Sequence, residues 1–335
     1  MKNSASIISI DPADAEFEEL AGPGSLVETR EFVVGAAQHG ERLDKCLVKA
    51  IPEFSRSYLQ QLVSDGAVAV DGMVVVKPST RLKAGAGGRI ALRATPQSRA
   101  FKPQSMPLRI VFEDQHLLVI EKPAGLVVHP APGNWSGTLL NGLLAYDPAF
   151  ADLPRAGIVH RLDKDTSGLM LVARTRPVMD KLVQMIAGRS VQRQYIALAH
   201  RAWSGPAARE VSSAIARDPK NRLRMAVVDP AQHAGKAART SLELMCNAES
   251  GCLVRCTLHT GRTHQIRVHL ASIGHPLVAD ATYGGASAAG LRRQALHAFR
   301  LALSHPADDT ALDFRSPLPP DLCDGLKQWG LELPG

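Results

Sequence analysis

The sequence predicts an α+β protein made of a small N-terminal module and a larger domain. Residues 41–93 show the order helix, helix, β-hairpin, which predicts a small α+β unit. The rest of the chain mixes strand and helix candidates without the strict alternation of a doubly wound parallel sheet, which favours the α+β class. A segment with two prolines and no periodicity, 95–105, separates the two parts. We therefore expect a flexible acidic tail at 1–30, the module at 31–94, this linker, and the larger domain at 106–335.

Composition narrows the class of protein. The chain has 335 residues, 45% of them hydrophobic and 21% charged, which fits an ordinary water-soluble protein with room for two domains. It has no run of about 18 apolar residues, so we expect no membrane-spanning segment. The N-terminus lacks the pattern of a secretion signal. Five cysteines, an odd number unevenly spread, favour reduced thiols and a cytoplasmic location.

The charge is distributed unevenly along the chain. The formal net charge is +7, but residues 1–30 carry six acidic and two basic side chains, so the remaining 305 residues carry +11. A basic body suits a polyanionic partner, although basic charge for solubility alone is the simpler alternative. Because the charge is clustered, we favour RNA as the partner.

Local signals define the elements of the small module. Apolar residues at helical spacing predict a helix over 43–51, which Pro52 ends. Ser55 is a candidate N-cap for a second helix, which Gly66 ends. Asp71-Gly72 predicts a hairpin turn. The strands expected in this module are residues 67–70, 73–76 and 89–92.

The module also carries basic side chains that could form one phosphate-binding face. Such contacts give affinity and register with little sequence information. Any one of them could be ordinary surface charge, but as a set we expect them to bind RNA. They are Arg42, Lys45, Lys49, Arg56 and Lys77.

The larger domain contains several short apolar runs and three helical patterns. Thr263 is a candidate N-cap for the last helix, with Ile266, Leu270 and Ile273 facing inward and Gly274 closing it. The other expected helices cover 141–144 and 179–186. The expected strands cover 110–112, 117–120, 158–159, 169–172, 195–199, 240–245 and 253–258.

A tight charged loop lies between two of these apolar runs, 158–159 and 169–172. It contains two carboxylates, Asp163 and Asp165, between the cations Arg161 and Lys164. Loops held by rigid strands are frequent places for catalytic groups. A charged turn is the simpler interpretation, and we adopt it for Asp165.

Asp163 is interpreted differently because of a resemblance. Residues 160–169 read His-Arg-Leu-Asp-Lys-Asp-Thr-Ser-Gly-Leu, and further motifs occur in order at 121–130, 193–197 and 261–269. Together these segments resemble the RluA-type pseudouridine synthases over most of residues 105–320. Residues 41–93 are similar to the S4-type RNA-binding module.

The resemblance implies a mixed, mostly antiparallel central sheet with a catalytic cleft. It also implies a monomeric enzyme that converts specific uridines to pseudouridine in large-subunit (23S) ribosomal RNA, free or within pre-ribosomal particles. Two alternatives remain open: another ribosomal or transfer RNA as substrate, and a non-catalytic ribosome-assembly factor. Since the isomerisation involves no net oxidation or group transfer, no cofactor or metal is expected.

The resemblance also assigns roles to residues. Asp163 is expected to be the catalytic carboxylate, which either attacks C1′ or withdraws the 2′ proton. Arg262 is expected to pair with it and keep it ionised. Tyr195 is expected to lie against the target base, with a core tyrosine as the alternative. Arg161 is expected to occupy the gap left by the flipped base, with an ordinary ion pair as the alternative.

Two further groups of residues are candidate ligand-binding sites. The segment 217–224 contains four cations around a Pro-Lys-Asn turn, and we expect its Lys220 and Arg222 to grip the RNA backbone. His259, His264 and His269 resemble a metal-ligand string. Five-residue spacing places successive positions about 140° apart on a helix, and the usual His-Glu-x-x-His pair is absent. We therefore expect no metal site.

Overall fold

The structure is a computed structural model that describes residues 28–93, 95, 100–221 and 223–332. The chain divides into two compact units, Met1–Ala100 and Phe101–Gly335, each with its own core. Most of the predicted tail lies outside the described residues. Its last three positions were assigned wrongly, because the first strand already begins at Glu28.

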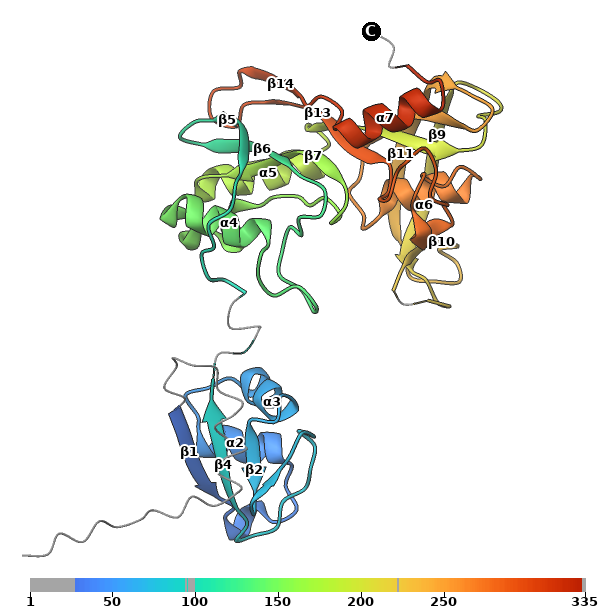
Figure 1. The fold of residues 1–335 in the computed structure, drawn as a ribbon. Helices are drawn as coiled ribbons and strands as arrows, with labels where there is room; N and C mark the ends of the chain where they lie inside the picture. Colours follow the sequence, from blue (N-terminus) through green and yellow to red (C-terminus); the bar gives the residue numbers. More distant parts are fainter. Residues whose placement is uncertain (1–27, 94, 96–99, 222, 333–335) are drawn as a thin grey trace, which may run out of the picture. The chain divides into compact units, whose positions relative to one another are not determined.

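The first unit is a four-stranded sheet with two helices (Figure 1). Its strand order is β1-β4-β2-β3, and all pairs are antiparallel. The helices pack through buried leucines, among them Leu43, Leu47, Leu59 and Leu62. The elements are β1 (Glu28–Val33), η1 (Ala36–Gln38), α2 (Leu43–Ala50), α3 (Arg56–Ser64), β2 (Val68–Val70), β3 (Met73–Val74) and β4 (Gly87–Leu92).

The local signals predicted for this unit are mostly confirmed. The Ser55 side chain accepts a hydrogen bond from the Tyr58 backbone N–H and caps α3. Asp71 and Gly72 both have positive φ, at 49° and 78°, as a tight hairpin turn between β2 and β3 requires. The strand predicted over 73–76 ends at Val74, earlier than expected.

The second unit contains a ten-stranded sheet and several helices. Its strands are β5 (Arg109–Glu113), β6 (Leu117–Lys122), β7 (Ser167–Ala173), β8 (Gln192–His200), β9 (Ala208–Arg217), β10 (Met225–Val228), β11 (Lys236–Asn247), β12 (Gly251–Leu258), β13 (Leu296–Ser304) and β14 (Ala311–Arg315). Its helices are α4 (Leu139–Tyr146), η3 (Pro148–Asp152), η4 (Pro154–Gly157), α5 (Arg176–Ala187), α6 (Gln265–Ser272), η5 (Ala281–Tyr283) and α7 (Pro320–Gln328).

This sheet is mixed and mostly antiparallel, as expected. Its strand order is β10-β9-β11-β12-β8-β13-β7-β6-β5, and β14 pairs with β13. The one parallel pair among the described residues joins β13 to β7. β13 thus connects two antiparallel half-sheets, β5–β7 and β8–β12 (Figure 1).

The alternation of side chains along β6 explains how helices cover both faces of the first half-sheet. Leu117 and Val119 belong to the cluster that includes Leu182 of α5. Leu118 and Ile120, which point the other way, belong to the cluster that includes Leu140 of α4. Burial on both faces accounts for the continuous apolar run in the sequence.

Two sequence predictions in this unit are wrong. Ile158 forms only an isolated bridge with Val172, so 158–159 is not a strand. The helix expected after Thr263 begins at Gln265, and its N-terminal flanking residue His264 has left-handed φ and no side-chain cap. The boundary between the two units, after Ala100, falls within the predicted linker 95–105.

No helix in the part of the chain that the structure describes is long and apolar enough to cross a membrane.

Candidate active site

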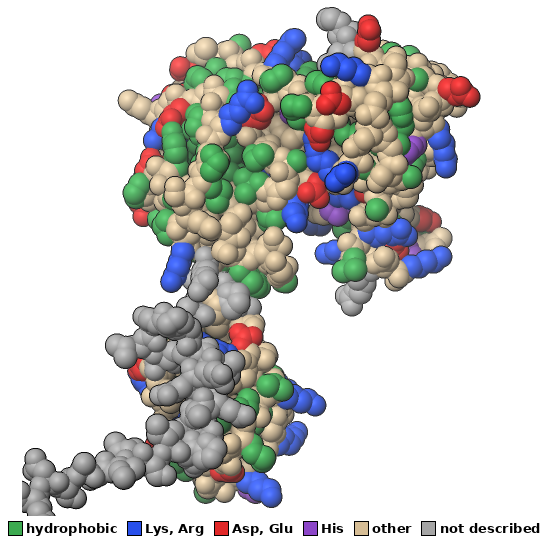
Figure 2. All heavy atoms as spheres, viewed as in Figure 1, with side chains coloured by type: hydrophobic (Ala, Val, Ile, Leu, Met, Phe, Trp, Pro, Cys, Tyr) green, Lys and Arg blue, Asp and Glu red, His purple; other side chains and the backbone are tan. Residues whose placement is uncertain are grey.

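A cavity of about 870 Å³ lies in the second unit, lined by the loop before β7, by β8 and by the segment leading into α6. Charged and histidine side chains gather in a hollow on the face of this unit (Figure 2). Among the described residues that line the cavity, one is acidic, Asp163, and six are arginines. The arginines are Arg155, Arg161, Arg189, Arg193, Arg262 and Arg267. A cavity with this balance favours an anionic ligand.

The Asp163 loop is held at both ends by close backbone contacts. Thr166 donates its N–H to the Asp163 carbonyl at 3.1 Å, which closes the turn. Gly168 has a φ of +115°, and a Cβ there would lie 2.2 Å from the Ala298 carbonyl oxygen of β13. Only glycine allows this approach, so the loop is fixed against the strand at the centre of the sheet.

Lys122 fixes the same loop from the other side. Its side chain is 1% exposed, and its Nζ donates to the carbonyls of Pro123, Leu126 and Lys164 at 2.8–2.9 Å. Burial lowers the pKa of Lys122 to about 7, against the opposing charges of Asp165 and Asp163. All three donor positions of the ammonium are used, so this lysine ties the loop to the turn after β6.

Asp163 is bound by Arg267, not by the predicted Arg262. Arg267 Nη1 lies 3.0 Å from Asp163 Oδ2, while Arg262 is exposed and donates its Nε–H to the Ala237 carbonyl. Arg262 lies in the loop before α6 and turns to the Ala237 carbonyl, whereas Arg267, inside the helix, reaches the carboxylate. An arginine between Ile266 and Val268, inside an apolar helix, was the signal that could have identified it.

Arg267 is itself rigidly held. Its Nε and Nη2 bind the two carboxylate oxygens of Asp280 at 2.7 and 2.8 Å. Burial alone would lower the pKa of Arg267, but hydrogen bonds and charge from Asp280 and Asp163 raise it. The arginine therefore stays charged, and its fork is oriented before any substrate arrives.

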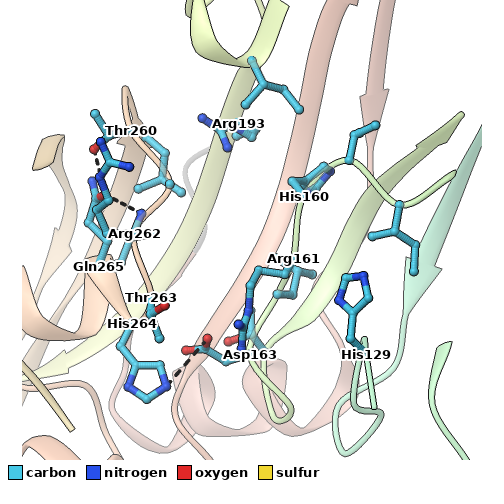
Figure 3. Close-up of a pocket in the computed structure, with 18 of the residues that line it drawn as sticks. His129, His160, Arg161, Asp163, Arg193, Thr260, Arg262, Thr263, His264 and Gln265 are labelled. Atoms are coloured by element: carbon cyan, nitrogen blue, oxygen red, sulfur yellow. Dashed lines mark hydrogen bonds and ion pairs between the residues drawn. The ribbon is translucent and has the colours of Figure 1, made fainter. Parts of the chain in front are cut away.

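His264 lies on the other side of the carboxylate. Its Nε2 is 3.9 Å from Asp163 Oδ1 (Figure 3), and its Nδ1 is 2.8 Å from the Tyr283 hydroxyl. Burial lowers the pKa of His264, although the Asp163 charge opposes this. The histidine is therefore neutral at neutral pH, which leaves Arg267 as the cation that binds Asp163.

Tyr195 lies on β8 and lines the same cavity. Its side chain is 5% exposed, and burial raises the pKa of its phenol to about 12. The hydroxyl is therefore protonated at neutral pH. The structure thus brings Asp163 and Tyr195 to one cavity, as the sequence predicted.

Arg161 is exposed and lines the cavity beside Asp163 (Figure 3). Within the described part of the chain no carboxylate forms an ion pair with it. The alternative interpretation, an ordinary ion pair, therefore finds no support in the structure.

In the first unit, two of the predicted phosphate-binding arginines share a buried carboxylate. Arg42 and Arg56 both bind Asp44, at 2.9 and 2.7 Å. The hydrogen bond from Arg42 outweighs burial and holds the pKa of Asp44 far below its usual range. Lys45 and Lys77 are exposed. The two arginines thus neutralise a buried carboxylate while their side chains stay 40% and 49% exposed, and the lysines extend into solvent.

The predicted basic loop joins β9 to β10. Lys220 is exposed, and its backbone N–H donates to the Asp218 carboxylate, which also binds Arg224 at 2.7 Å. Arg222 lies outside the described residues. Arg224 is thus engaged in holding the loop.

The three histidines of the rejected metal string point to different partners. His259 is within hydrogen-bond distance of Ser241, and the buried His269 of Thr240 and Ser213. Within the described residues, no group of three or more His, Cys, Asp and Glu side chains is arranged to hold a metal ion.

A carboxylate held by a fixed arginine, in a cavity that also contains a tyrosine and is rich in arginine, is typical of an enzyme site for an anionic substrate. Residues 116–272 match the RNA pseudouridylate synthase family, and residues 41–86 match the S4 domain. The chain belongs to the RNA pseudouridylate synthase family.

Individual relatives and a solved structure agree with this assignment. The chain is 44% identical over 304 residues to the ribosomal large subunit pseudouridine synthase D of Neisseria meningitidis serogroup A, covering 88% of this chain and 80% of the relative. It is 43% identical over 312 residues to the protein of that name from Nitrosomonas europaea, covering 90% and 88%. The structure of human RNA pseudouridylate synthase domain containing 4 has the same fold, with a TM-score of 0.54 at 24% identity, covering 68% of this chain and 95% of that one.

Proposed function

We propose that this protein isomerises uridines to pseudouridine in large-subunit ribosomal RNA, with Asp163 as the catalytic carboxylate. The observation that carries the proposal is the Asp163–Arg267 pair inside an arginine-lined cavity. The names of the relatives support the choice of ribosomal RNA as substrate. The S4 domain supports RNA as the partner.

Asp163 acts first on the ribose of the target. The bond between C1′ and N1 breaks, and the uracil turns. A new bond then forms from C1′ to C5, the C5 proton leaves to solvent, and N1 takes up a proton, so that the product is an isomer of the substrate. The carboxylate either attacks C1′ or withdraws the 2′ proton, and both routes need it ionised and in a fixed position. Arg267 supplies the fixed position, because it binds Asp163 and is itself held by Asp280.

Tyr195 contacts the uracil as a neutral phenol. Since the pKa of its hydroxyl is about 12, it does not act as a base at neutral pH. Its ring offers a flat apolar surface for the base, and burial on β8 fixes its position. This role suits a base that must turn within the cavity while it stays bound.

Arg161 occupies the space that the flipped uridine leaves in the RNA. Flipping a base out of a helix costs a few kcal/mol. An exposed arginine beside Asp163 can replace the lost stacking with its planar guanidinium. Lys45, Lys77, Lys220 and Arg222 contact backbone phosphates and thereby hold the RNA.

Chemical mapping of pseudouridine in ribosomal RNA tests the proposal. RNA from a strain that lacks the protein should lose pseudouridine at particular large-subunit positions. Wild-type protein should restore them, and an Asp163→Asn variant should not. If the map is unchanged in the deletion strain, large-subunit RNA is not the substrate, and transfer RNA from the same strain becomes the next sample to map.

A further inference from the structure

Arg193 is a buried arginine without an anionic partner among the described residues. Its side chain lies on β8, is 5% exposed and lines the cavity. Its Nε atom is shielded from solvent and has no hydrogen-bond partner. By contrast, Arg267, which lines the same cavity, binds the carboxylates of Asp163 and Asp280. An uncompensated buried cation is destabilising, so its persistence at this place suggests that a ligand completes the site.

A second donor without a partner lies close to Arg193. The Leu171 backbone N–H donates to His160 Nε2 at 2.9 Å, so the ring proton lies on Nδ1. That Nδ1 is buried and has no hydrogen-bond partner. Burial and the charge of Arg193 lower the pKa of His160 to about 3, so the ring is neutral. Both side chains line the cavity (Figure 3), and both lack an acceptor.

Gly261 leaves room for the end of the Arg193 side chain. A Cβ at position 261 would lie 3.1 Å from Arg193 Nη1. The guanidinium thus reaches the loop between β12 and α6, which also carries Arg262. Arg189 and Arg262 are exposed and line the same cavity. The concentration of positive charge here favours an oxyanion.

We propose that Arg193 binds a backbone phosphate of the RNA adjoining the uridine that is held at Asp163. This inference rests on the proposed function, because it assumes that the cavity receives a nucleotide. Residues two apart on a strand point to the same face, about 7 Å apart, so Arg193 is placed one step along β8 from Tyr195. When the base of a nucleotide packs against Tyr195, its phosphate therefore lies within reach of Arg193. The planar guanidinium can donate hydrogen bonds to two phosphate oxygens at once.

Binding of two small ligands tests the proposal without requiring turnover. Uridine and uridine 3′,5′-bisphosphate are titrated into the full-length wild type and into Arg193→Met and Arg193→Lys variants by calorimetry. The wild type should bind the bisphosphate at least about 10-fold more tightly than uridine, as a charge-assisted contact gives. Arg193→Met should lose most of this preference and keep its affinity for uridine, and Arg193→Lys should keep part of it. Arg209→Met, an exposed arginine on β9 outside the cavity, should behave as the wild type.

Thermal unfolding separates a binding role from a structural one. Without ligand, Arg193→Met should unfold at the wild-type temperature or above it, because an unpaired buried charge is removed. The bisphosphate should raise the unfolding temperature of the wild type but not of this variant.

Three outcomes would overturn the proposal. A lowered unfolding temperature of Arg193→Met, with an unchanged preference for the bisphosphate over uridine, would show that Arg193 has a structural role. If Arg193→Met loses equal affinity for uridine and for the bisphosphate, Arg193 contacts the base or the ribose and the proposal is overturned. A wild type that binds the two ligands equally well would overturn it too. If ribosomal RNA mapping fails while this preference holds, only the proposed function falls.

Discussion

The Asp163 carboxylate and the Arg267 guanidinium meet at 3.0 Å, although 104 residues of sequence separate them. Asp280 holds the same guanidinium from the other side through two hydrogen bonds. The arginine is therefore fixed before RNA binds, and it can hold Asp163 in one orientation without rearrangement during the reaction.

Asp163→Asn should stop isomerisation and spare RNA binding. The amide is nearly the same size but is neither an anionic nucleophile nor a base, so the rate should fall by at least about 1,000-fold. Tritium release from C5-labelled uridine, with affinity measured on the same preparation, reports both quantities. Asp165→Asn is the matched control and should remain active. If Asp163→Asn isomerises uridine at a rate near that of the wild type, Asp163 is not the catalytic carboxylate.

Arg267→Lys should lower the rate of isomerisation. Lysine keeps the charge but loses the planar fork that joins Asp163 to Asp280, so the catalytic carboxylate should be held less firmly in position. Single-turnover rates at saturating RNA measure the loss. Arg262→Lys, which changes an arginine that does not bind Asp163, is the matched control and should lose less activity. An equal loss in both variants would argue against Arg267 as the group that positions Asp163.

Lys122→Met should destabilise the second unit and slow the reaction. The change leaves the carbonyls of Pro123, Leu126 and Lys164 without their donor, which should lower the free energy of unfolding by about 3 kcal/mol. Urea denaturation measures this loss. Lys181→Met, on an exposed position of α5, should change it little. An equal effect of both substitutions would show that the buried ammonium does not hold the loop.

Stability should decrease as the pH falls from about 6.5 towards 4. Burial lowers the pKa of His269 and of His297 to about 4 in the folded protein, against about 6.5 when unfolded. Between these values the unfolded state binds more protons, so each histidine removes up to about 1.4 kcal/mol per pH unit. Urea denaturation at several pH values measures the slope. His297→Gln should flatten it, and an unchanged slope would exclude this histidine as a cause.

Lys45→Gln combined with Lys77→Gln should weaken RNA binding and reduce its salt dependence. Each lost phosphate contact should lower the slope of log affinity against log salt by about 1. Turnover at saturating RNA should change little, because neither lysine lines the cavity. Lys327→Gln, an exposed lysine on α7, serves as the control. A double variant with the wild-type slope would remove these lysines from the RNA contact.

The sequence predicted the elements that depend on local signals. Ser55 caps its helix, Asp71-Gly72 forms the hairpin turn, and the loop motif brings Asp163 to the cavity. For Ser55 and Asp71-Gly72 the decisive interaction involves residues a few positions apart. The position of Asp163 followed instead from the resemblance, and its loop is fixed by the distant contacts of Lys122 and Gly168. Tyr195 was also placed at the cavity, because the motif that contains it fixes its position on a strand.

The identity of the arginine that binds Asp163 depended on distant contacts. Gln265 accepts hydrogen bonds from the Arg262 N–H and the Thr260 hydroxyl, and donates to the Arg239 carbonyl and to Thr240. These bonds set where α6 begins and hence which arginine faces Asp163. Half of its partners lie about 25 residues away, and the 261–269 motif contains both arginines, so spacing alone could not distinguish them. The sequence could not show that Arg193 lacks a partner either, because this depends on the absence of a carboxylate or other acceptor near its Nε on the surrounding described elements.

The central position of β13 has a consequence for synthesis of the protein. β7 and β8 each pair with β13 and not with one another, so the half-sheet beside Asp163 and the half-sheet that carries α6 have no shared strand until Leu296–Ser304 has left the ribosome. A nascent chain can thus complete both halves and still lack the pairing that brings Asp163 to Arg267. The enzyme is consequently inactive during almost all of its own translation, and any product truncated before β13 should be catalytically silent.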